Sequence, residues 1–352
     1  MVKNKTRKKR KRKTIKSKIR TLKSYSPTIN KQLNSLKDNI KLQQLTTNCP
    51  KKKQIYIHNK KKCFDWNDKV VKQFYINNLL AKKINEKRIL APKQYQSNCW
   101  FNTFFMVFFI SDKGRKFTRH FRETMITGKR MDRSNLDNNV LWPFFELNTM
   151  IHSTLEGHYG GIMNTNKSIM NLYKILIQHF NNLPFHLKKK YYLQHLMPKS
   201  VNDAGNPLSI YEYLMIYLGK NPIQLTHVNV NVINNKKKVF KILKNEPHIP
   251  HIITVERFED DKIHLKNEYN FGKYKYKLDS IVLRDISQEH FSAYLTVNKK
   301  EFRFDGESFK RLKKFKWKKI INNANKTWQN TDEWDTPFNF TKGYGVYFYY
   351  RT

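Results

Sequence analysis

The chain contains few cysteines, few acidic residues and no long apolar run. Its 352 residues include only three cysteines, which cannot form a disulfide framework, so at least one thiol is expected to be free. No apolar signal-peptide core follows the N-terminus. The longest apolar run, residues 99–110, is broken by Asn102 and Thr103 and is too short to span a bilayer. We therefore expect an intracellular protein, in the cytoplasm or the nucleus, without a membrane span.

Acidic residues are scarce relative to basic ones. The chain has 27 Asp and Glu against 69 Lys and Arg, which gives a net charge of +42. Residues 1–23 carry 13 Lys or Arg and no acid. Such a segment repels itself and has little to bury, so we predict a disordered basic tail over residues 1–45. Two roles are open for it, a solubility tail or an arm for nuclear import or nonspecific nucleic-acid binding.

The region that follows the tail is polar at first and then amphipathic. We predict a linker and an N-terminal helix over residues 46–89, with the helix in the sequence DWNDKVVKQFYINNLLAKKINEKR, residues 65–88. Asn67 is the expected N-cap, and apolar residues such as Val71 and Phe74 form one stripe of that helix. The predicted role of this helix is packing.

One cysteine lies between polar side chains and a wall of aromatic residues, in QYQSNCWFNTFF, residues 94–105. Ser97 or Asn98 can cap a helix that begins at Cys99 and is apolar on nearly every face, which predicts a helix buried in the centre of the protein. A helix start favours the thiolate, the nucleophilic form of cysteine. Gln94, five residues upstream, can direct its side-chain NH₂ toward an oxyanion. This stretch fits either a nucleophile with its oxyanion donor or a buried structural cysteine.

A catalytic cysteine needs a base, and one of the twelve histidines has a suitable context. His290 opens HFSAYLTVNKKEFRFDGES, in which two alternating segments flank a turn at residues 298–300. This pattern predicts a hairpin with His290 at the start of one strand and Asp305 at the end of the other. Those ends are neighbours in an antiparallel pair, so Asp305 can orient the imidazole. The chain order Cys, His, Asp is typical of papain-like thiol hydrolases.

Six blocks, in the same order, resemble the ubiquitin-specific proteases, a family of papain-like deubiquitinating enzymes. The resemblance spans residues 90–352, and its blocks are QYQSNCWFNTFFMVFF, LSIYEYLMIYL, PHIPHIITVERF, YKYKLDSIVLRD followed by HFSAYL, FRFDG, and GYGVYFYYR. The resemblance implies an α+β, papain-like cysteine peptidase fold in which a helical lobe packs on an antiparallel β-sheet lobe. Residues 90–352 would form the catalytic domain.

The resemblance also implies an activity and a set of residues. Cys99 would be the nucleophile, His290 the base, Asp305 its orienting partner and Gln94 the oxyanion donor, although the family usually has Asn at the place of Gln94. The expected reaction is hydrolysis of peptide or isopeptide bonds at the C-terminal glycine of ubiquitin or a ubiquitin-like modifier. The enzyme is expected to act as a monomer and without a cofactor.

Substrate contacts are expected at residues outside the catalytic group. Glu212 belongs to the block LSIYEYLMIYL, and Tyr294 lies on the strand that begins at His290. The tail of ubiquitin is basic and prefers an acidic receptor. The best acidic patch for it lies in VERFEDD, residues 255–261, with Glu256, Glu259, Asp260 and Asp261.

No metal site is expected. The zinc fingers of many family members would lie between Leu218 and Ile252, but this interval holds no cysteine and cannot form a four-cysteine zinc site. We predict a short hairpin there, from THVNVNVIN and KKVFKIL. Cys49, His58 and Cys63 have irregular spacing in a lysine-rich segment, which disfavours them as metal ligands.

A different function class stays open from the sequence. The chain could be a basic nucleic-acid-binding or virion-associated protein on a degenerate papain-like fold. Retention of all four active-site candidates argues against degeneracy. The abundance of Lys, Asn, Ile, Tyr and Phe suggests an AT-rich genome such as that of a large DNA virus, which adds the virion or the virus factory to the expected locations.

Overall fold

The computed structural model describes most of the chain after the predicted tail. The described residues are 49–50, 53–94, 97–130, 132–157, 165–185, 205, 207–218, 225–246, 248–259, 261–330 and 337–352. The predicted tail, residues 1–45, lies outside this set. Within the described part of the chain, no helix combines the length and the apolar character that crossing a membrane requires.

A small hairpin and a helix begin the described structure. Strands β1 (Gln54–Ile57) and β2 (Lys62–Asp65) pair antiparallel around the short helix η1 (His58–Lys60), and helix α3 (Lys69–Leu79) follows. The N-cap of α3 is Asp68, whose side chain accepts from the Val70 backbone N–H at 2.8 Å, and not Asn67 as predicted. The predicted helix also extends too far. It ends at Leu79, and the carbonyls of Ala81 and Lys82 beyond it accept hydrogen bonds from the Arg115 guanidinium.

The region predicted as a linker is partly folded. Ile55 and Ile57 of β1 are buried with Tyr75 of α3 against Ile126 and Phe145 of the helical layer described below. Burial of this apolar surface makes the hairpin and α3 part of the folded body.

The three cysteines divide into one pair and one free thiol. Cys49 and Cys63 form a disulfide, and Cys99 is free, as expected for at least one thiol. Because both outer cysteines are covalently paired, they do not provide thiolate ligands for a metal with His58.

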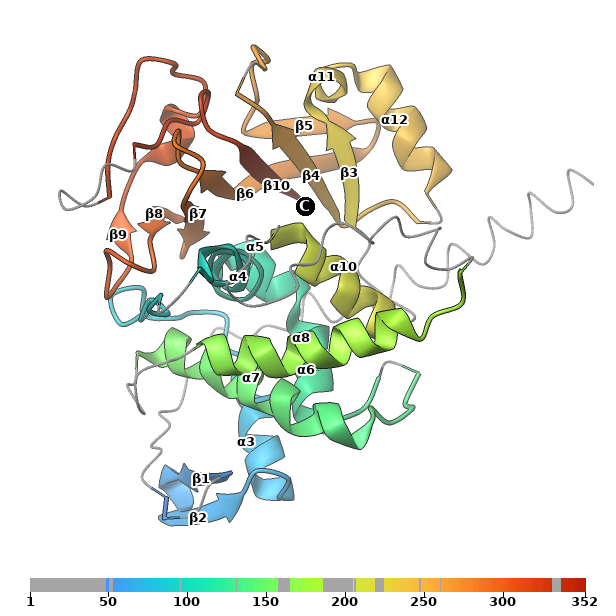
Figure 1. Cartoon of the computed structure of the whole chain (residues 1–352), viewed down its shortest axis with the longest axis vertical. Coiled ribbons are helices and arrows are strands. Elements are labelled where there is room, and N and C mark those ends of the chain that lie inside the picture. Colours follow the sequence, from blue (N-terminus) through green and yellow to red (C-terminus); the bar gives the residue numbers. More distant parts are fainter. Residues whose placement is uncertain are drawn as a thin grey trace, which may run out of the picture.

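The central helical layer is built around the segment that carries Cys99. Its elements are α4 (Cys99–Phe105), the π-helical segment η2 (Met106–Ile110), α5 (Asp112–Phe117), α6 (Arg119–Thr127), α7 (Asn138–Glu156), α8 (Thr165–Asn181) and α10 (Pro207–Leu218). Every residue of α4 and η2 is buried, which confirms the predicted central helix. Figure 1 shows α4 between the sheet and the layer of α7 and α8.

An eight-stranded sheet covers the other side of α4. Its strands are β3 (Leu225–Asn229), β4 (Ile252–Arg257), β5 (Glu268–Phe271), β6 (Tyr274–Arg284), β7 (Phe291–Val297), β8 (Lys300–Phe304), β9 (Lys313–Lys314) and β10 (Gly345–Arg351). They are ordered β3-β4-β10-β6-β7-β8-β9, and β5 pairs with β6. All pairs are antiparallel except β3 with β4. The mixed helix and sheet content fits the predicted α+β class.

The hairpin predicted between Leu218 and Ile252 is wrong. Strand β3 is followed by the helices α11 (Val230–Ile233) and α12 (Lys236–Asn245). Val239 and Leu243 are four residues apart and both buried, which is a helical spacing, and the Asn235 side chain caps α12 by accepting from the Lys238 backbone N–H. The parallel pairing of β3 with β4 requires this helical crossover.

Both faces of the sheet are covered. Phe108 of η2 stacks on Tyr211 of α10 and meets Phe348 of β10 edge to face, which joins the helices to one face. On the opposite face, Trp317 and Phe338 belong to a second core. The middle strands are therefore buried on both sides.

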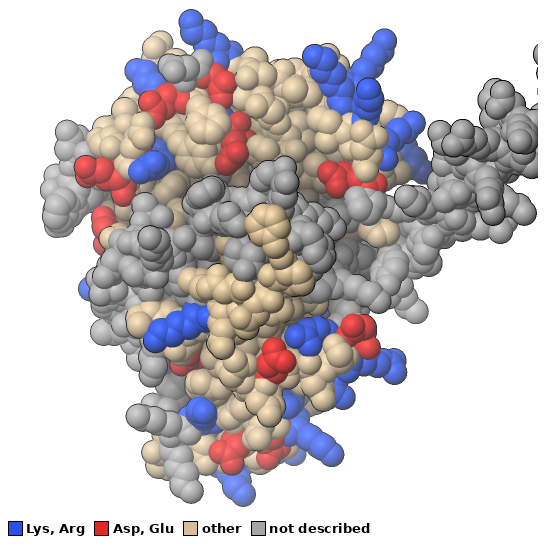
Figure 2. Space-filling view, turned by 45° about the vertical axis from the view of Figure 1, so that its right-hand side comes forward, with Lys and Arg blue, Asp and Glu red and all other residues tan. Residues whose placement is uncertain are grey.

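Lysine and arginine side chains are spread over the surface rather than confined to one half. Figure 2 shows them mainly in the upper and lower parts of one face, with acidic side chains interspersed and a denser basic group at the upper right. Helix α12 alone contributes five lysines, at residues 236, 237, 238, 241 and 244. Such a surface favours association with polyanions.

Candidate thiol active site

The predicted hairpin is present, and it brings His290 and Asp305 together. Strands β7 and β8 pair antiparallel with Ala293 opposite Phe304, and they are joined by Asn298 and Lys299. Both turn residues have positive φ, 47° and 62°, as a two-residue turn of type I′ requires. At the far end of the hairpin, His290 Nε2 lies 3.0 Å from Asp305 Oδ1.

The backbone at His290 is fixed by an aspartate that the sequence reasoning missed. Asp285 is fully buried, and its Oδ1 accepts from the backbone N–H groups of Glu289 at 2.8 Å and of His290 at 2.7 Å. The Asp285 N–H donates to the His290 carbonyl at 2.9 Å. An aspartate that binds backbone N–H groups a few residues ahead is a common turn device, so Asp285 before His290 was a readable signal.

Asp305 is held in place by donors besides the histidine. Its Oδ1 accepts from the Glu307 backbone N–H at 3.0 Å, and its Oδ2 accepts from Asn330 Nδ2 at 2.8 Å. Asn330 Nδ2 also contacts Ser292 Oγ at 3.0 Å. Burial on its own raises the pKa of Asp305, but the bonds from His290, Asn330 and the backbone outweigh it and lower the pKa below its ordinary value. The carboxylate is therefore ionised at neutral pH.

Cys99 completes the group from the helical side. Its side chain is 8% exposed at the first residue of α4. His290 Nε2 is bound to Asp305, so Nδ1 is the ring nitrogen that remains for the thiol. Burial lowers the pKa of His290, but hydrogen bonds to Asp305 and Cys99, together with their charges, raise it to about 11. The imidazolium is therefore the favoured form of His290.

A buried polar network fixes the start of α4. Asn98 Nδ2 donates to Thr165 Oγ1 at 3.0 Å, and Thr165 Oγ1 donates to Asn102 Oδ1 at 2.7 Å. All three residues are fully buried. Asn98 occupies the N-cap position without a side-chain capping bond, because its side chain turns to Thr165 instead. This network holds Cys99 at a defined position.

Gln94 lies beside the loop that follows Asp305. Its backbone N–H donates to the Gly306 carbonyl at 2.9 Å. Its side-chain Nε2 donates to Glu307 Oε1 at 2.7 Å, and its Oε1 is buried without a hydrogen-bond partner among the described residues. The predicted donor therefore lies beside the loop that follows Asp305, and one of its two amide protons binds the Glu307 carboxylate.

Glu307 is a further neighbour that the sequence reasoning missed. Its side chain is 41% exposed, and its Oε2 lies 3.9 Å from His290 Nδ1. Glu307 thus contacts Gln94 with one oxygen and faces His290 with the other. It lies two residues after Asp305, which brings its carboxylate back over the same end of the hairpin.

Tyr294, predicted to contact substrate, lies in the core. Its side chain is fully buried, and its hydroxyl accepts from Trp328 Nε1 at 2.9 Å. Its ring packs edge to face on Phe340. The prediction is wrong for this residue because β7 is buried on both faces. Side chains that alternate between the two faces of this strand therefore all point into the core.

The predicted acidic patch is only partly available. Glu256 lies 3.1 Å from His227 Nε2 and accepts from the Tyr344 hydroxyl, and Asp261 accepts from the Phe258 backbone N–H at 2.8 Å. Glu259 accepts a hydrogen bond from Gln288, which lies two residues before His290. This bond places Glu259 beside residues 285–290, called the histidine loop below. Asp260 and the side chain of Glu212 lie outside the described residues.

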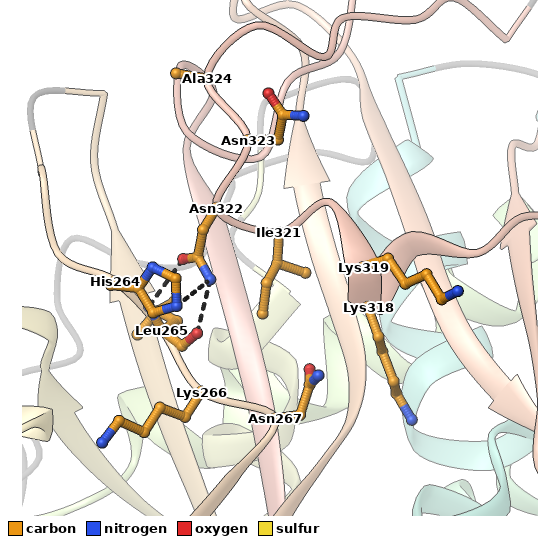
Figure 3. A pocket seen from close by; sticks show the side chains of 10 residues that line it. All are labelled: His264, Leu265, Lys266, Asn267, Lys318, Lys319, Ile321, Asn322, Asn323 and Ala324. Carbon is orange, nitrogen blue, oxygen red and sulfur yellow. Dashed lines mark hydrogen bonds between the residues drawn. The ribbon is translucent and has the colours of Figure 1, made fainter.

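A separate pocket, here called the basic hollow, is lined by residues that are distant from Cys99 in the sequence. Its volume is about 680 Å³, and Figure 3 shows its lining residues, His264, Leu265, Lys266, Asn267, Lys318, Lys319, Ile321, Asn322, Asn323 and Ala324. The ammonium groups of Lys266, Lys318 and Lys319 point in different directions. The three charges do not converge on one point, and none of Cys99, His290 and Asp305 lines this hollow.

Comparison with known proteins gives distant similarities. No protein-family model matches the sequence, and no curated protein matches it. Among solved structures, the SAGA DUB module of Ubp8, Sgf11, Sus1 and Sgf73 bound to monoubiquitin aligns with a TM-score of 0.43 and 11% identity over 97% of each chain. An essential yeast splicing factor aligns with a TM-score of 0.38 and 10% identity, over 85% of this chain and 83% of the other. Both TM-scores lie below 0.5, so neither similarity establishes a shared fold.

Replacing Asn330 with alanine is expected to lower the free energy of unfolding at neutral pH. The change removes a buried donor to the Asp305 carboxylate, at a cost of about 1.5–3 kcal/mol in unfolding free energy. Because the pKa of Asp305 is lower in the folded than in the unfolded protein, the ionised carboxylate stabilises the fold at pH values above its unfolded-state pKa. This stabilisation is lost as the pH falls through the folded-state pKa.

The difference between wild type and Asn330→Ala in urea unfolding should therefore shrink on acidification. Asn325→Ala, a change at an exposed asparagine, is the matched control and should match wild type throughout. A difference that stays constant across the titration of Asp305 would contradict the assigned role of Asn330.

Proposed function

We propose that the protein is a thiol-dependent peptidase in which Cys99 is the nucleophile, His290 the base and Asp305 the residue that orients it. The observation that carries the proposal is the buried pairing of His290 with Asp305 on one side and Cys99 on the other. Engagement of Nε2 by the carboxylate leaves Nδ1 for the thiol. A buried structural cysteine would not need an oriented, charged histidine at this position.

The proposed reaction has two covalent steps. The Cys99 thiolate attacks the carbonyl carbon of the scissile bond, and the Gln94 amide proton that is not bound to Glu307 donates to the oxyanion. The tetrahedral species collapses to a thioester as His290 donates a proton to the leaving amine. His290 then takes a proton from water, which attacks the thioester and releases the acid and Cys99. Asp305 keeps the ring oriented in both steps.

Ubiquitin or a ubiquitin-like modifier is the proposed acyl partner. The sequence blocks that resemble the ubiquitin-specific proteases support this choice, and they include all three triad residues. Glu259 adds support because a carboxylate beside the histidine loop suits a basic peptide tail. A papain-like arrangement of lobes, action as a monomer, and location in the cytoplasm, nucleus or virion stay predictions.

The alternative is a basic nucleic-acid-binding protein on a degenerate peptidase fold. The hydrogen bonds that fix His290 and Asp305 count against it, because a degenerate site has no need of a fully bonded carboxylate. Nonspecific nucleic-acid binding remains a proposal for the basic tail, alongside the peptidase activity and not in place of it.

The proposed function is tested by a ubiquitin probe with a C-terminal electrophile. The probe should form a covalent adduct with the wild-type chain and none with Cys99→Ala, because only the thiolate of Cys99 faces the histidine. The double variant Cys49→Ala/Cys63→Ala is the matched control and should still be labelled. Running parallel probes built on ubiquitin-like modifiers identifies the preferred one. Labelling that persists in Cys99→Ala would refute the assignment of the nucleophile.

Charge reversal at Glu259 is expected to affect substrate capture more than chemistry. Glu259→Lys should raise KM for a ubiquitin-fluorophore substrate several-fold with little change in kcat, and the effect should fade at high salt because the site is exposed. Glu123→Lys on α6 serves as a control for the change in net charge. Equal KM values for wild type and Glu259→Lys at low salt would remove Glu259 from the substrate path.

A further inference from the structure

Glu307 contacts two members of the proposed site, and the two contacts are unequal. Its Oε1 accepts from Gln94 Nε2 at 2.7 Å, which is the length of a strong hydrogen bond to a charged acceptor. Its Oε2 lies 3.9 Å from His290 Nδ1, which is too long for a hydrogen bond. Gln94 is therefore the residue that Glu307 holds more firmly.

The loop that carries Glu307 is anchored beside Gln94. The Glu307 backbone N–H donates to Asp305 Oδ1 at 3.0 Å. The Gln94 backbone N–H donates to the Gly306 carbonyl at 2.9 Å. A Cβ atom at Gly306 would lie only 3.3 Å from Gln94 Cβ and 3.3 Å from Asn102 Nδ2, so the missing side chain lets this loop approach both Gln94 and helix α4. The Glu307 carboxylate thus extends from a backbone that is fixed next to its partner.

The side-chain amide of Gln94 has two orientations, related by a half-turn about its last rotatable bond. In the structure, Nε2 faces Glu307, and Oε1 is buried without a hydrogen-bond partner among the described residues. A buried carbonyl without a partner costs free energy, so this orientation needs compensation from the other end of the amide. A carboxylate provides it, because it accepts from N–H and repels a carbonyl oxygen. Glu307 therefore selects the orientation in which Nε2 faces it.

The length of Gln94 adds to the need for a partner. A glutamine has one more rotatable side-chain bond than an asparagine, so its amide samples more positions. Holding the amide in one position costs entropy, and the charged hydrogen bond to Glu307 offsets that cost. Because the amide is planar, binding one proton of Nε2 also fixes the direction of the second.

We propose that Glu307 is a positioning residue that fixes the Gln94 amide for oxyanion binding. This inference rests on the proposed function, in which the second proton of Gln94 Nε2 donates to the oxyanion. Glu307 binds the first proton, keeps Oε1 away from the developing negative charge, and acts on the reaction only through Gln94. A donor that is held in place before the reaction starts needs no reorganisation when the charge develops.

Glu307→Ala should lower kcat for a ubiquitin-fluorophore substrate by about 10–10²-fold, the scale of a misplaced catalytic group, with KM nearly unchanged. This loss should be smaller than the loss of about 10²–10³-fold expected for Gln94→Ala, because the released amide still reaches the donating orientation part of the time. Urea unfolding midpoints show whether each variant is folded. Wild-type kcat in Glu307→Ala would overturn the inference.

Glu307→Gln separates the hydrogen bond from the charge. Its side-chain oxygen can still accept from Gln94 Nε2, so kcat should recover from the Glu307→Ala value toward that of the wild type. Glu289→Ala is the matched control, because it removes another exposed carboxylate, one residue before His290, and should leave kcat unchanged. A Glu307→Gln enzyme as slow as Glu307→Ala would assign the effect to the charge beside His290 and refute the role through Gln94.

The double variant Gln94→Ala/Glu307→Ala decides whether Glu307 acts through Gln94. If it does, Glu307→Ala should lower kcat when Gln94 is present and have no further effect once Gln94 is replaced by alanine. Equal losses in both backgrounds would show that the two residues act independently, and the positioning role would be wrong.

Probe labelling separates this inference from the proposed function. In a wild-type chain that reacts with the ubiquitin probe at Cys99, the Glu307 variants test the positioning role by itself. Full activity of Glu307→Ala in such an enzyme refutes the positioning role and leaves the peptidase intact. A wild-type chain that neither reacts with the probe nor cleaves the substrate refutes the peptidase, and the positioning role is refuted with it.

Discussion

His290→Ala is expected to lower kcat/KM for a ubiquitin-fluorophore substrate by about 10²–10⁴-fold, the range for loss of a positioned acid and base. The variant removes the side chain that hydrogen-bonds both Cys99 and Asp305. His264→Ala, at an exposed histidine in the basic hollow, is the control and should retain wild-type kcat/KM. Wild-type activity of His290→Ala would refute the assigned base.

The pH dependence of the same reaction should report the raised pKa of His290. The active form pairs the thiolate with the imidazolium, so activity is lost when His290 loses its proton. Because Asp305 and Cys99 raise this pKa to about 11, the alkaline limb of kcat/KM should lie well above the range of a free imidazole. Asp305→Asn keeps the shape of the side chain but removes its charge, so the alkaline limb should move to lower pH. An unchanged limb would contradict the role of Asp305.

The same shift has a defined sign for stability. The folded-state pKa of His290 is higher than its unfolded value of about 6.5. Its contribution is therefore fully present below pH of about 6.5 and is lost as the pH rises toward the folded value. The stability of the wild type relative to His290→Ala should decline across this alkaline interval.

Phe108→Ala is expected to lower the unfolding free energy by about 3–5 kcal/mol. Phe108 is fully buried, and its ring stacks on Tyr211 at a centroid distance of 4.9 Å and meets Phe348 at 5.2 Å. It also packs on Phe104 at 4.8 Å, within the helix that begins at Cys99. Truncation leaves a cavity at the contact between the helices and the sheet, and close packing prevents the surroundings from filling it.

Urea unfolding measures this loss as a decrease in the midpoint with little change in slope. Phe258→Ala is the matched control, because Phe258 is 57% exposed and its truncation should change stability by no more than about 0.5 kcal/mol. Equal losses in the two variants would show that Phe108 does not join the two layers as described. Active-site labelling of Phe108→Ala at low temperature should persist in the fraction that stays folded.

Several features near the site follow from local sequence pattern. The run after Cys99 is apolar on nearly every face, which predicts a helix in the interior, and its complete burial confirms this. The alternation around residues 298–300 sets the register of β7 and β8. Because that register is set locally, the sequence alone places His290 and Asp305 at the same end of the hairpin.

Other features depend on segments that are distant in the sequence. Asn330 reaches Asp305 across 25 residues, and Glu307 reaches Gln94 across 213. No periodicity encodes such contacts. The same reason explains the misplacement of Tyr294, since alternation separates the two faces of a strand but does not reveal that a second core covers the outer one.

Short apolar runs were the weakest guide to secondary structure. Residues 239–243 have the composition of a strand as much as of a helix, and only burial of Val239 and Leu243 on one side distinguishes α12 from the predicted hairpin. The polar segment before α3 folds because Ile55 and Ile57 pack in one buried cluster with Ile126 of α6 and Phe145 of α7. The sequence by itself singled out Cys99 as the proposed nucleophile, His290 as its proposed base and Asp305 as the partner of that base, because each lies in a motif with a recognisable local pattern. The tertiary structure alone decided which other side chains surround them, because Asn330 contacts Asp305, and Glu307 contacts Gln94, through long-range packing of the chain.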